Sequence, residues 1–273
     1  MSSSCEAQRF MWICSLSYRF QPVTRPFGVN NKPCVCSLLC SKISLYSLHL
    51  DKRQRSFAKY QHQLHQTPSI LWLEDIFGKF DEMHYPIGLL YDLFVTNSEL
   101  PWQITVHFDK YPDNKILKCS SKDVVEAHLM HSLKEADALK HRNHIMSLMQ
   151  ERDHKQLWLG LLHDRFDQFW SANRKLMDHT AEEGFRHIPF RLYAPQLTSK
   201  PFIQYLVKPI ENEKKMTIED LLQKANLNFE SKGQYQVVIH GIDIPLETPL
   251  QWISEHLSYP DNFLHLCIRY PST

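Results

Sequence analysis

Cysteines are the first side chains in this sequence with the chemistry to bind a metal. Cys34, Cys36 and Cys40 lie close together, and Cys5 and Cys14 would supply further thiolate ligands. Structural zinc sites use paired C-x-x-C units, and this spacing contains none. We therefore interpret these residues as buried or surface thiols and predict no metal site.

A thiol nucleophile is a second possibility. Cys119 has His107, His128 and Asp123 nearby in the sequence, and a cysteine hydrolase needs a base beside its thiol. Nothing in this spacing favours a catalytic set over a buried thiol near the start of a helix. No catalytic residue is predicted.

Phosphate-binding and hydrolase motifs are absent from the sequence. The chain has seven glycines and contains no G-x-G-x-x-G, G-x-x-x-x-G-K or G-x-S-x-G, the loops that hold nucleotide phosphates or a nucleophilic serine. His62 and His65 lack the surrounding H-E-x-x-H of a metalloprotease and are read as a polar helix face. We expect no nucleotide-driven catalysis and no cofactor.

Lys134 is an amine with open surroundings in the longest helical pattern of the chain. From residue 120 onward, apolar residues recur every three or four positions, and Ser120 and Asp123 are spaced as a helix-capping pair. The predicted buried stripe consists of Val125, Leu129, Leu133, Ala136 and Leu139. At about 100° per residue, Lys134 falls opposite this stripe, beside Ala127 and Ala138. On this pattern alone it is an ordinary solvated helix residue.

Aromatic residues dominate the next helical segment, which is predicted as one helix over 157–177. Asp164, Asp167 and Arg174 fall away from its apolar face on the helical wheel. That face consists of Leu157, Trp158, Leu161, Leu162, Phe166, Phe169, Trp170 and Leu176. A face of this size needs the flanking domains or a partner to bury it.

Length and composition are those of an ordinary globular protein. The 273 residues suffice for about two compact units, and the hydrophobic content is 43%. Lys and Arg number 31 against 30 Asp and Glu, so bulk charge does not indicate a nucleic-acid partner. No apolar run reaches the roughly 20 residues of a membrane span. Seven cysteines without a secretion signal indicate a reducing compartment, and we expect a cytosolic protein.

The N-terminal part has weaker patterns. Strands are predicted over 11–20 and 43–50, with a loop over 22–33. The apolar run Ile87–Phe94 predicts a buried helix, and the alternation after Leu100 predicts a strand to Phe108. A helix followed by a late strand fits the second half of a small α+β domain.

The C-terminal part has the clearest architecture. Alternating residues predict strands over 188–193, 202–210, 236–240 and 263–270, and periodic apolar residues predict helices over 217–228 and 250–257. Two strands, a helix and two further strands, with a short helical crossing between the last pair, follow the order of a β-grasp, or ubiquitin-like, domain.

Several segments together resemble one family, that of autophagy protein 5. They occur in the family's order from residue 84 to about 267. The segments are His84–Leu90 (HYPIGLL), Leu100–Trp102 (LPW), Lys134–His141 (KEADALKH), Asp153–Trp158 (DHKQLW), Asp164–Trp170 (DRFDQFW), Ile188–Arg191 (IPFR), Glu247–Trp252 (ETPLQW) and Ser254–His265 (SEHLSYPDNFLH).

The resemblance implies an α+β fold with two ubiquitin-like (β-grasp) domains flanking a helix-rich region. The expected domains are an N-terminal ubiquitin-like domain over 1–112, a helix-rich region over 113–186 and a C-terminal ubiquitin-like domain over 187–273. Residues 43–83 match the family weakly. Residues 1–42 match poorly, and represent either a divergent version of the first strands or an altered segment replacing them.

The resemblance also implies a function. In this family the first lysine of the KEADALKH motif, here Lys134, receives the C-terminal glycine of the ubiquitin-like autophagy protein 12. Lys140, later in the motif, is expected to be an exposed structural residue. The sequence ends in Thr273, with no glycine after Gly241, so we expect an acceptor rather than a modifier with a glycine tail.

The expected role is a non-catalytic scaffold rather than an enzyme. The resemblance implies conjugation by activating and conjugating enzymes and non-covalent binding of autophagy protein 16. The conjugate would act like a ubiquitin ligase that promotes lipid attachment to autophagy protein 8, in the cytoplasm and peripherally at the phagophore membrane, without nucleic acid. The alternative is an unconjugated ubiquitin-like adaptor that only binds partners.

Overall fold

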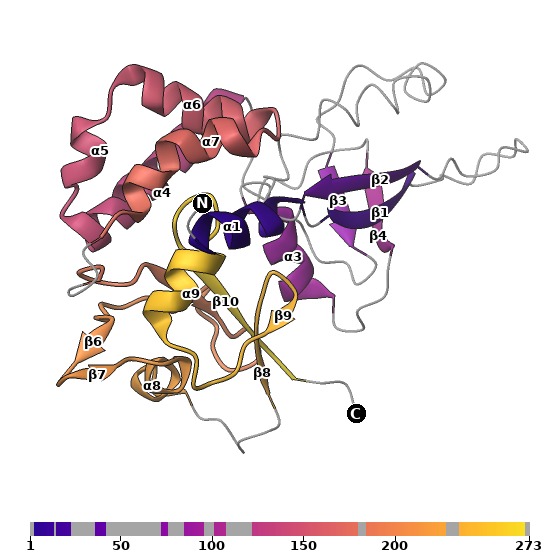
Figure 1. The fold of residues 1–273 in the computed structure, drawn as a ribbon. Helices are drawn as coiled ribbons and strands as arrows, with labels where there is room; N and C mark the ends of the chain where they lie inside the picture. The colour runs from indigo at the N-terminus through magenta and orange to yellow at the C-terminus, as the bar shows by residue number, and fades with distance from the viewer. Residues whose placement is uncertain are drawn as a thin grey trace, which may run out of the picture. The chain divides into compact units, whose positions relative to one another are not determined.

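The computed structural model describes residues 3–13, 15–22, 36–41, 72–75, 85–95, 101–107, 122–179, 184–227 and 235–270. Figure 1 shows its helices and strands. The chain divides into two compact units, one of Ser15–Val125 and the other of Met1–Cys14 with Glu126–Thr273. None of the helices in the described stretches has the length and apolar content that a bilayer-spanning segment needs.

The unit of residues 15–125 is built on a four-stranded mixed sheet. Its strands are β1 (Ser15–Pro22), β2 (Cys36–Ser41), β3 (Trp72–Asp75) and β4 (Trp102–His107), in the order β2-β1-β4-β3. β1 pairs antiparallel with β2 and parallel with β4, and β3 pairs antiparallel with β4. Two antiparallel pairs joined by a central parallel pair make a β-grasp sheet. The strand predicted over 43–50 lies outside the described residues.

Helix α3 (Ile87–Phe94) supplies apolar core to this unit. Ile87, Leu89 and Leu90 are fully buried. Tyr91 packs edge-on against Trp102 of β4, with 6.0 Å between the ring centroids. The helix has the predicted bounds, and β4 lies within the predicted strand.

The N-terminal segment begins as a helix, where the sequence predicts a strand from Met11. α1 (Ser3–Ile13) packs within its own unit against α9 (Leu250–Leu257), and Met11 is buried in it. The Oγ of Ser3 lies 3.3 Å from Nε2 of His256 on α9. Contacts from the far end of the chain therefore select a helix here, and the strand starts four residues later, at Ser15.

A helical region follows, starting with α4 (Lys122–His141) and α5 (His144–Leu148). The stripe predicted on α4 is buried, apart from the half-buried Leu139. Its residues with at most 2% exposure are Val125, Leu129, Leu133 and Ala136. Ser120 lies outside the described residues, so the predicted capping pair stays a prediction.

The prediction of one helix over 157–177 is wrong. The structure has α6 (Glu151–Leu162), α7 (Phe166–Asn173) and a 3₁₀ turn, η2 (Arg174–Met177). The chain turns at Asp164, whose φ of 56° is left-handed and cannot continue a right-handed helix. α6 and α7 then pack against each other, and Trp158, Phe166 and Phe169 are buried.

The C-terminal domain is a second β-grasp sheet. Its strands, in spatial order, are β5 (Phe190–Tyr193), β10 (Leu264–Arg269), β8 (Gln236–Ile239) and β9 (Ile242–Asp243). The pair β5–β10 is parallel, and the other two pairs are antiparallel. α8 (Ile218–Lys224), which is shorter than predicted, and α9 contribute fully buried core residues, namely Ile218, Leu221, Leu250 and Ile253.

The strand predicted over 202–210 is wrong in its extent. Ile203 forms an isolated bridge with Leu192, through hydrogen bonds of 2.8 and 3.0 Å. Ladder pairing appears only at the end, where β6 (Ile210–Glu211) pairs with β7 (Lys214–Lys215). Between the bridge and β6, the carbonyl oxygen of Val207 accepts a hydrogen bond of 2.9 Å from the N–H of Ile188. The alternating pattern of this segment is that of a strand, but the segment has no continuous partner.

Candidate functional site

Helix α4 presents Lys134 to solvent. The lysine is exposed, as its position opposite the buried stripe predicts, and Ala127 and Ala138 on the same face are exposed as well. Among the described residues, the amine has no hydrogen-bond or ion-pair partner. Small neighbours and an unpaired amine leave this face open to a large reaction partner.

The next residue, Glu135, is held by the C-terminal domain. Its Oε2 accepts a hydrogen bond of 3.2 Å from Arg191 of β5, and its Oε1 accepts one of 3.0 Å from Nε2 of Gln204. Both carboxylate oxygens are thus engaged, on a half-buried side chain. The turn of α4 that carries Lys134 is fixed to the C-terminal domain through this carboxylate.

Arg191 is itself held firmly. Its guanidinium lies over the ring of Phe263 at 4.3 Å and over that of Phe202 at 5.3 Å. One of its nitrogens lies 3.9 Å from a carboxylate oxygen of Asp261. Aromatic faces and a second carboxylate therefore compensate for the burial of this charge.

Asp261 continues the network into the core. Nε2 of His265 lies 2.9 Å from Oδ2 of Asp261, and Nδ1 of the same ring lies 2.9 Å from the hydroxyl of Tyr193. Burial works to raise the pKa of Asp261, but the charges of His265 and Arg191 and the hydrogen bond from His265 hold that pKa below its ordinary value. The carboxylate is therefore ionised at neutral pH.

Lys140 is buried, and the prediction that it is exposed is wrong. Only 2% of its surface is accessible. Its Nζ donates a hydrogen bond of 3.2 Å to Sδ of Met177 and lies 4.3 Å from the ring centroid of Phe185. Burial lowers the pKa of Lys140 to about 7, and nearby carboxylates oppose this effect only in part. Such a side chain is a structural residue of the interior.

The position of Lys140 on the helical wheel predicts its burial. Six residues at about 100° each place Lys140 roughly 120° away from Lys134. This direction is that of Leu129 and Leu133, which belong to the buried stripe. The two lysines of one short motif therefore have opposite environments, one in solvent and one in the core.

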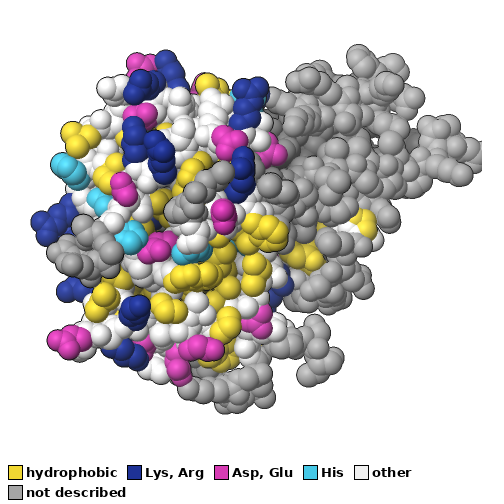
Figure 2. All heavy atoms as spheres, viewed as in Figure 1, with side chains coloured by type: hydrophobic (Ala, Val, Ile, Leu, Met, Phe, Trp, Pro, Cys, Tyr) yellow, Lys and Arg dark blue, Asp and Glu magenta, His cyan; other side chains and the backbone are white. Residues whose placement is uncertain are grey.

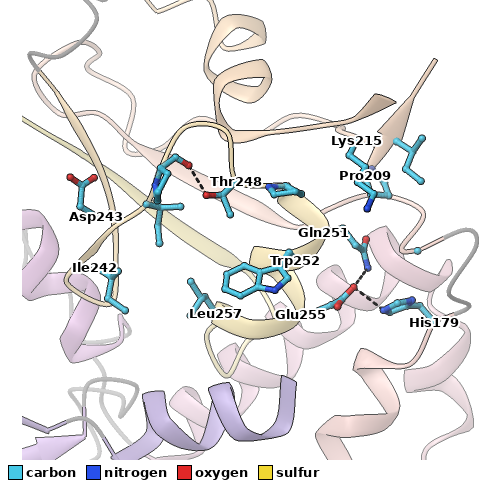
Figure 3. A pocket seen from close by; sticks show the side chains of 15 residues that line it. His179, Pro209, Lys215, Ile242, Asp243, Thr248, Gln251, Trp252, Glu255 and Leu257 are labelled. Carbon is cyan, nitrogen blue, oxygen red and sulfur yellow. Dashed lines mark hydrogen bonds and ion pairs between the residues drawn. The ribbon is translucent and has the colours of Figure 1, made fainter. Parts of the chain in front are cut away.

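A groove on the C-terminal domain is a second candidate site. It has a volume of about 770 Å³, and Figure 3 shows Trp252 of α9 in its centre. Trp252 is 47% exposed and Ile242 of β9 is 40% exposed. Figure 2 shows hydrophobic side chains gathered on the face that carries α9. No local sequence pattern indicates this groove, because its walls come from separate segments between His179 and Leu257.

Polar groups close one end of this groove. Oε1 of Glu255 lies 2.9 Å from Nε2 of His179 and accepts a hydrogen bond of 2.6 Å from Gln251 (Figure 3). Lys215 and Asp243 also line it. The groove therefore combines a large apolar floor with charges of both signs, which suits an amphipathic segment of another protein.

Comparisons with known proteins identify the family. Autophagy protein 5 of Drosophila melanogaster is 41% identical to this chain over 273 residues. The alignment covers 99% of this chain and 99% of the relative. This chain belongs to the autophagy protein 5 family. Autophagy-related protein 5 of Caenorhabditis elegans is 28% identical, over 88% of this chain and 90% of the relative. The crystal structure of Kluyveromyces marxianus Atg5 has a TM-score of 0.78 at 20% identity, covering 97% of this chain and 99% of that one.

Models of three autophagy protein ATG5 regions match in chain order. They are the UblA domain over residues 11–108, the alpha-helical bundle region over 122–179 and the UblB domain over 187–268. The fold is therefore the predicted one, with two ubiquitin-like domains flanking a helical region. Membership of the autophagy protein 5 family gives the chain a role in autophagy. Residues 1–42 match the family's motifs poorly, yet the UblA model matches from residue 11 and this segment includes β1 and β2, the opening hairpin of the first sheet.

The structure describes few of the predicted thiol and histidine candidates. Cys5 is a buried free thiol in α1, and burial raises its pKa. Within the described residues no group of three potential metal ligands occurs. The candidates whose residues or side chains lie outside the described part are Cys14, Cys34, Cys36, Cys40, His62, His65, His107 and Cys119. The metal and thiol-hydrolase readings gain no support from the residues that are described.

Proposed function

We propose that this chain is the acceptor for the ubiquitin-like autophagy protein 12, and that Lys134 forms the isopeptide bond. The observation that carries the proposal is the exposure of Lys134, in the KEADALKH segment of a helix that the family's helical-bundle model covers. Its amine is unpaired among the described residues, while Lys140 of the same segment is buried.

The reaction needs an amine and a thioester. The neutral Nζ attacks the carbonyl carbon of the modifier's C-terminal glycine, which a conjugating enzyme carries as a cysteine thioester. The C–N bond forms, the C–S bond breaks, and the enzyme's thiolate leaves. Counted from the ammonium form, the nitrogen loses two protons, of which the thiolate can take one. Activating and conjugating enzymes supply the catalysis, so this chain is an acceptor and scaffold rather than an enzyme.

The groove around Trp252 is the surface that we propose for autophagy protein 16, the non-covalent partner. An amphipathic helix laid in an apolar groove is a common recognition mode. Trp252 and Ile242 offer exposed apolar surface, and large exposed aromatic side chains are frequent binding hot spots. Lys215 and Asp243 would pair with charges at the margins of such a helix.

In this proposal the conjugate with autophagy protein 16 acts like a ubiquitin ligase. It promotes lipid attachment to autophagy protein 8 in the cytoplasm and peripherally at the phagophore membrane, with no role for nucleic acid. Family membership supports this part of the proposal. The alternative is an adaptor that binds the same partners without conjugation, and a stable heavier adduct in cell extracts distinguishes the two.

The test is Lys134→Arg, which keeps the positive charge and helix propensity but removes the primary amine. The variant is incubated with autophagy protein 12 and its activating and conjugating enzymes, and the products are separated by immunoblot. We expect no heavier adduct, unchanged binding of autophagy protein 16, and no support of lipidation.

The matched control is Lys122→Arg, because Lys122 is exposed on the same helix. Lys140→Arg is a poor control, since a guanidinium does not fit the buried site of Lys140. An adduct that persists in Lys134→Arg, or disappears in Lys122→Arg, would show that the acceptor is a different lysine. Wild-type protein that binds partners but forms no adduct would support the adaptor.

A further inference from the structure

The neighbours of Lys134 on α4 determine which side chains its amine can contact. On an α-helix, the residues at i±3 and i±4 are the ones within side-chain reach. For Lys134 these are Met130 and His131 on the N-terminal side, and Asp137 and Ala138 on the C-terminal side. Methionine and alanine offer no proton acceptor, so the two titratable neighbours decide the local proton chemistry.

Asp137 is committed to other groups. It is 1% exposed. Its Oδ1 lies 2.9 Å from Nδ1 of His141, and its Oδ2 accepts a hydrogen bond of 2.8 Å from the backbone N–H of Met146. The carboxylate of Glu135 is likewise bound on both oxygens. Both acids are thus engaged with other groups rather than with the amine of Lys134.

His131 is the neighbour that remains. It is exposed, and among the described residues its ring has no hydrogen-bond or ion-pair partner. Helical side chains lean toward the N-terminus and cover the turn before their own Cα. We therefore expect the side chain of Lys134 to lean toward the turn that carries His131, and both residues are exposed to the same reaction partner.

We propose that His131 is the proton acceptor for Lys134 in isopeptide formation. The proposal rests on the proposed role of Lys134 as the conjugation acceptor. A lysine amine is almost wholly protonated at neutral pH, whereas an imidazole takes up and releases protons there. Solvent takes the first proton from the ammonium, and the ring of His131 takes the second as the amine attacks the thioester carbonyl and the C–N bond forms. The C–S bond then breaks, and the proton on His131 passes to the departing thiolate or to solvent.

The charged groups around this face fit the role. Glu135, Arg191 and Asp261 form their own network, described above. His128, one turn before His131, is half-buried, and burial followed by the charge of Arg191 lowers its pKa. At about 100° per residue, His128 lies roughly 120° around the helix from Lys134, against about 60° for His131. His128 is therefore a suitable control, because it is a histidine on the same helix that does not face Lys134.

The experiment measures transfer of autophagy protein 12 from its purified conjugating-enzyme thioester to the full chain in a single turnover, from pH 6 to pH 9. His131→Gln keeps a polar side chain but removes the proton acceptor. We expect the transfer rate of this variant at pH 7 to be about ten-fold lower than that of wild type. General bases in enclosed sites contribute rate factors of about 10²–10⁴, and the smaller factor is expected here because water competes as a proton acceptor at an exposed site. We also expect the deficit to shrink toward pH 9, where hydroxide takes the proton in place of the imidazole.

The controls separate this inference from the proposed function. His128→Gln is expected to transfer at the wild-type rate, and His131→Gln to melt at the wild-type temperature because the side chain is exposed. A His131→Gln profile equal to the wild-type one, or lower by the same factor at every pH, would overturn the proton-acceptor role. Conjugation that persists in Lys134→Arg would instead overturn the acceptor assignment itself.

Discussion

The amine of Lys140 and the sulfur of Met177 lie 3.2 Å apart in a buried contact between the last turn of α4 and η2. The ring of Phe185 covers this contact, and the rings of His141 and His179 stand edge-on to Phe185, at centroid distances of 5.7 and 5.0 Å. A neutral sulfur and an aromatic face solvate an ammonium less well than water does. The free energy of this contact therefore depends on whether Lys140 is protonated.

Lys140→Met is expected to stabilise the chain most at low pH. The folded-state pKa of Lys140 is about 7, against an ordinary value of 10.5. Between these values the unfolded chain binds more protons, so the wild-type free energy of unfolding rises with pH, by up to about 1.4 kcal/mol per unit. Below about pH 7 both states are protonated and the full cost of the buried charge remains. Urea denaturation of both proteins from pH 6 to pH 9 measures the difference.

The control for this prediction is Lys208→Met, at an exposed lysine. Stability curves of Lys140→Met and wild type that run parallel across this range would show that the buried amine does not change its protonation on folding.

Gly160→Ala is expected to destabilise the helical region. A Cβ on Gly160 would lie 2.5 Å from the backbone nitrogen of Phe169 and 2.8 Å from its Cα. Because backbone atoms cannot rotate away as side chains do, α6 and α7 would have to separate, at a cost of about 3 kcal/mol. Thermal unfolding measures this, with Arg152→Ala on the exposed face of α6 as the control. Equal melting temperatures for the two variants would show that the α6–α7 contact adapts.

Local sequence patterns predicted the helices whose ends are set by neighbouring residues. α3 and α9 have their predicted bounds, because Pro86 and Pro249 stand directly before an apolar run and fix where each helix begins. The exposure of Lys134 followed from the same periodicity. The resemblance to the family then supplied the order of the domains, which periodicity alone does not determine.

Other features depend on contacts that no local pattern contains. Helix α1 is held by α9, through pairs such as Ser3 and His256, which are 253 residues apart. The Arg191–Glu135 pair spans 56 residues. The break at Asp164 depends on one left-handed residue inside a pattern that is periodic on both sides. The burial of Lys140 was predictable from the wheel, but its charge favoured the opposite interpretation.

Phe169→Ala is expected to lower stability, whereas Trp252→Ala is expected to weaken partner binding without lowering stability. Phe169 is 3% exposed and Trp252 is 47% exposed. Removing the buried ring leaves a cavity and costs roughly 3–5 kcal/mol, so Phe169→Ala, like Trp158→Ala, lowers the melting temperature and weakens partner binding with it. Trp252→Ala is expected to weaken binding of the autophagy protein 16 helix while the melting temperature stays near that of wild type. An unchanged melt with lost binding in Phe169→Ala would move Phe169 from the core to the interface.

Asp261→Asn is expected to weaken the chain at neutral pH and to remove part of its sensitivity to acid. The pKa of Asp261 is lowered in the folded state, because His265 and Arg191 outweigh the opposing effect of burial. A carboxyl group with a depressed pKa stabilises the fold above its unfolded-state pKa, near 4, and this stabilisation is lost as the pH falls through the folded-state value. The amide keeps the shape of the side chain but leaves the buried Arg191 without this carboxylate, at a cost of roughly 3 kcal/mol.

Denaturation of wild type and Asp261→Asn between pH 7 and pH 3 measures both effects, with Asp178→Asn at an exposed aspartate as the control. The two curves should be well separated at pH 7 and converge as the pH falls, since protonation removes from the wild type the charge that the substitution has already removed. The same variant also tests the link to α4, because Arg191 joins Asp261 to Glu135, the residue next to Lys134. Curves that coincide at pH 7 would mean that Glu135, Phe202 and Phe263 suffice to hold Arg191, and that Asp261 is not part of what fixes α4.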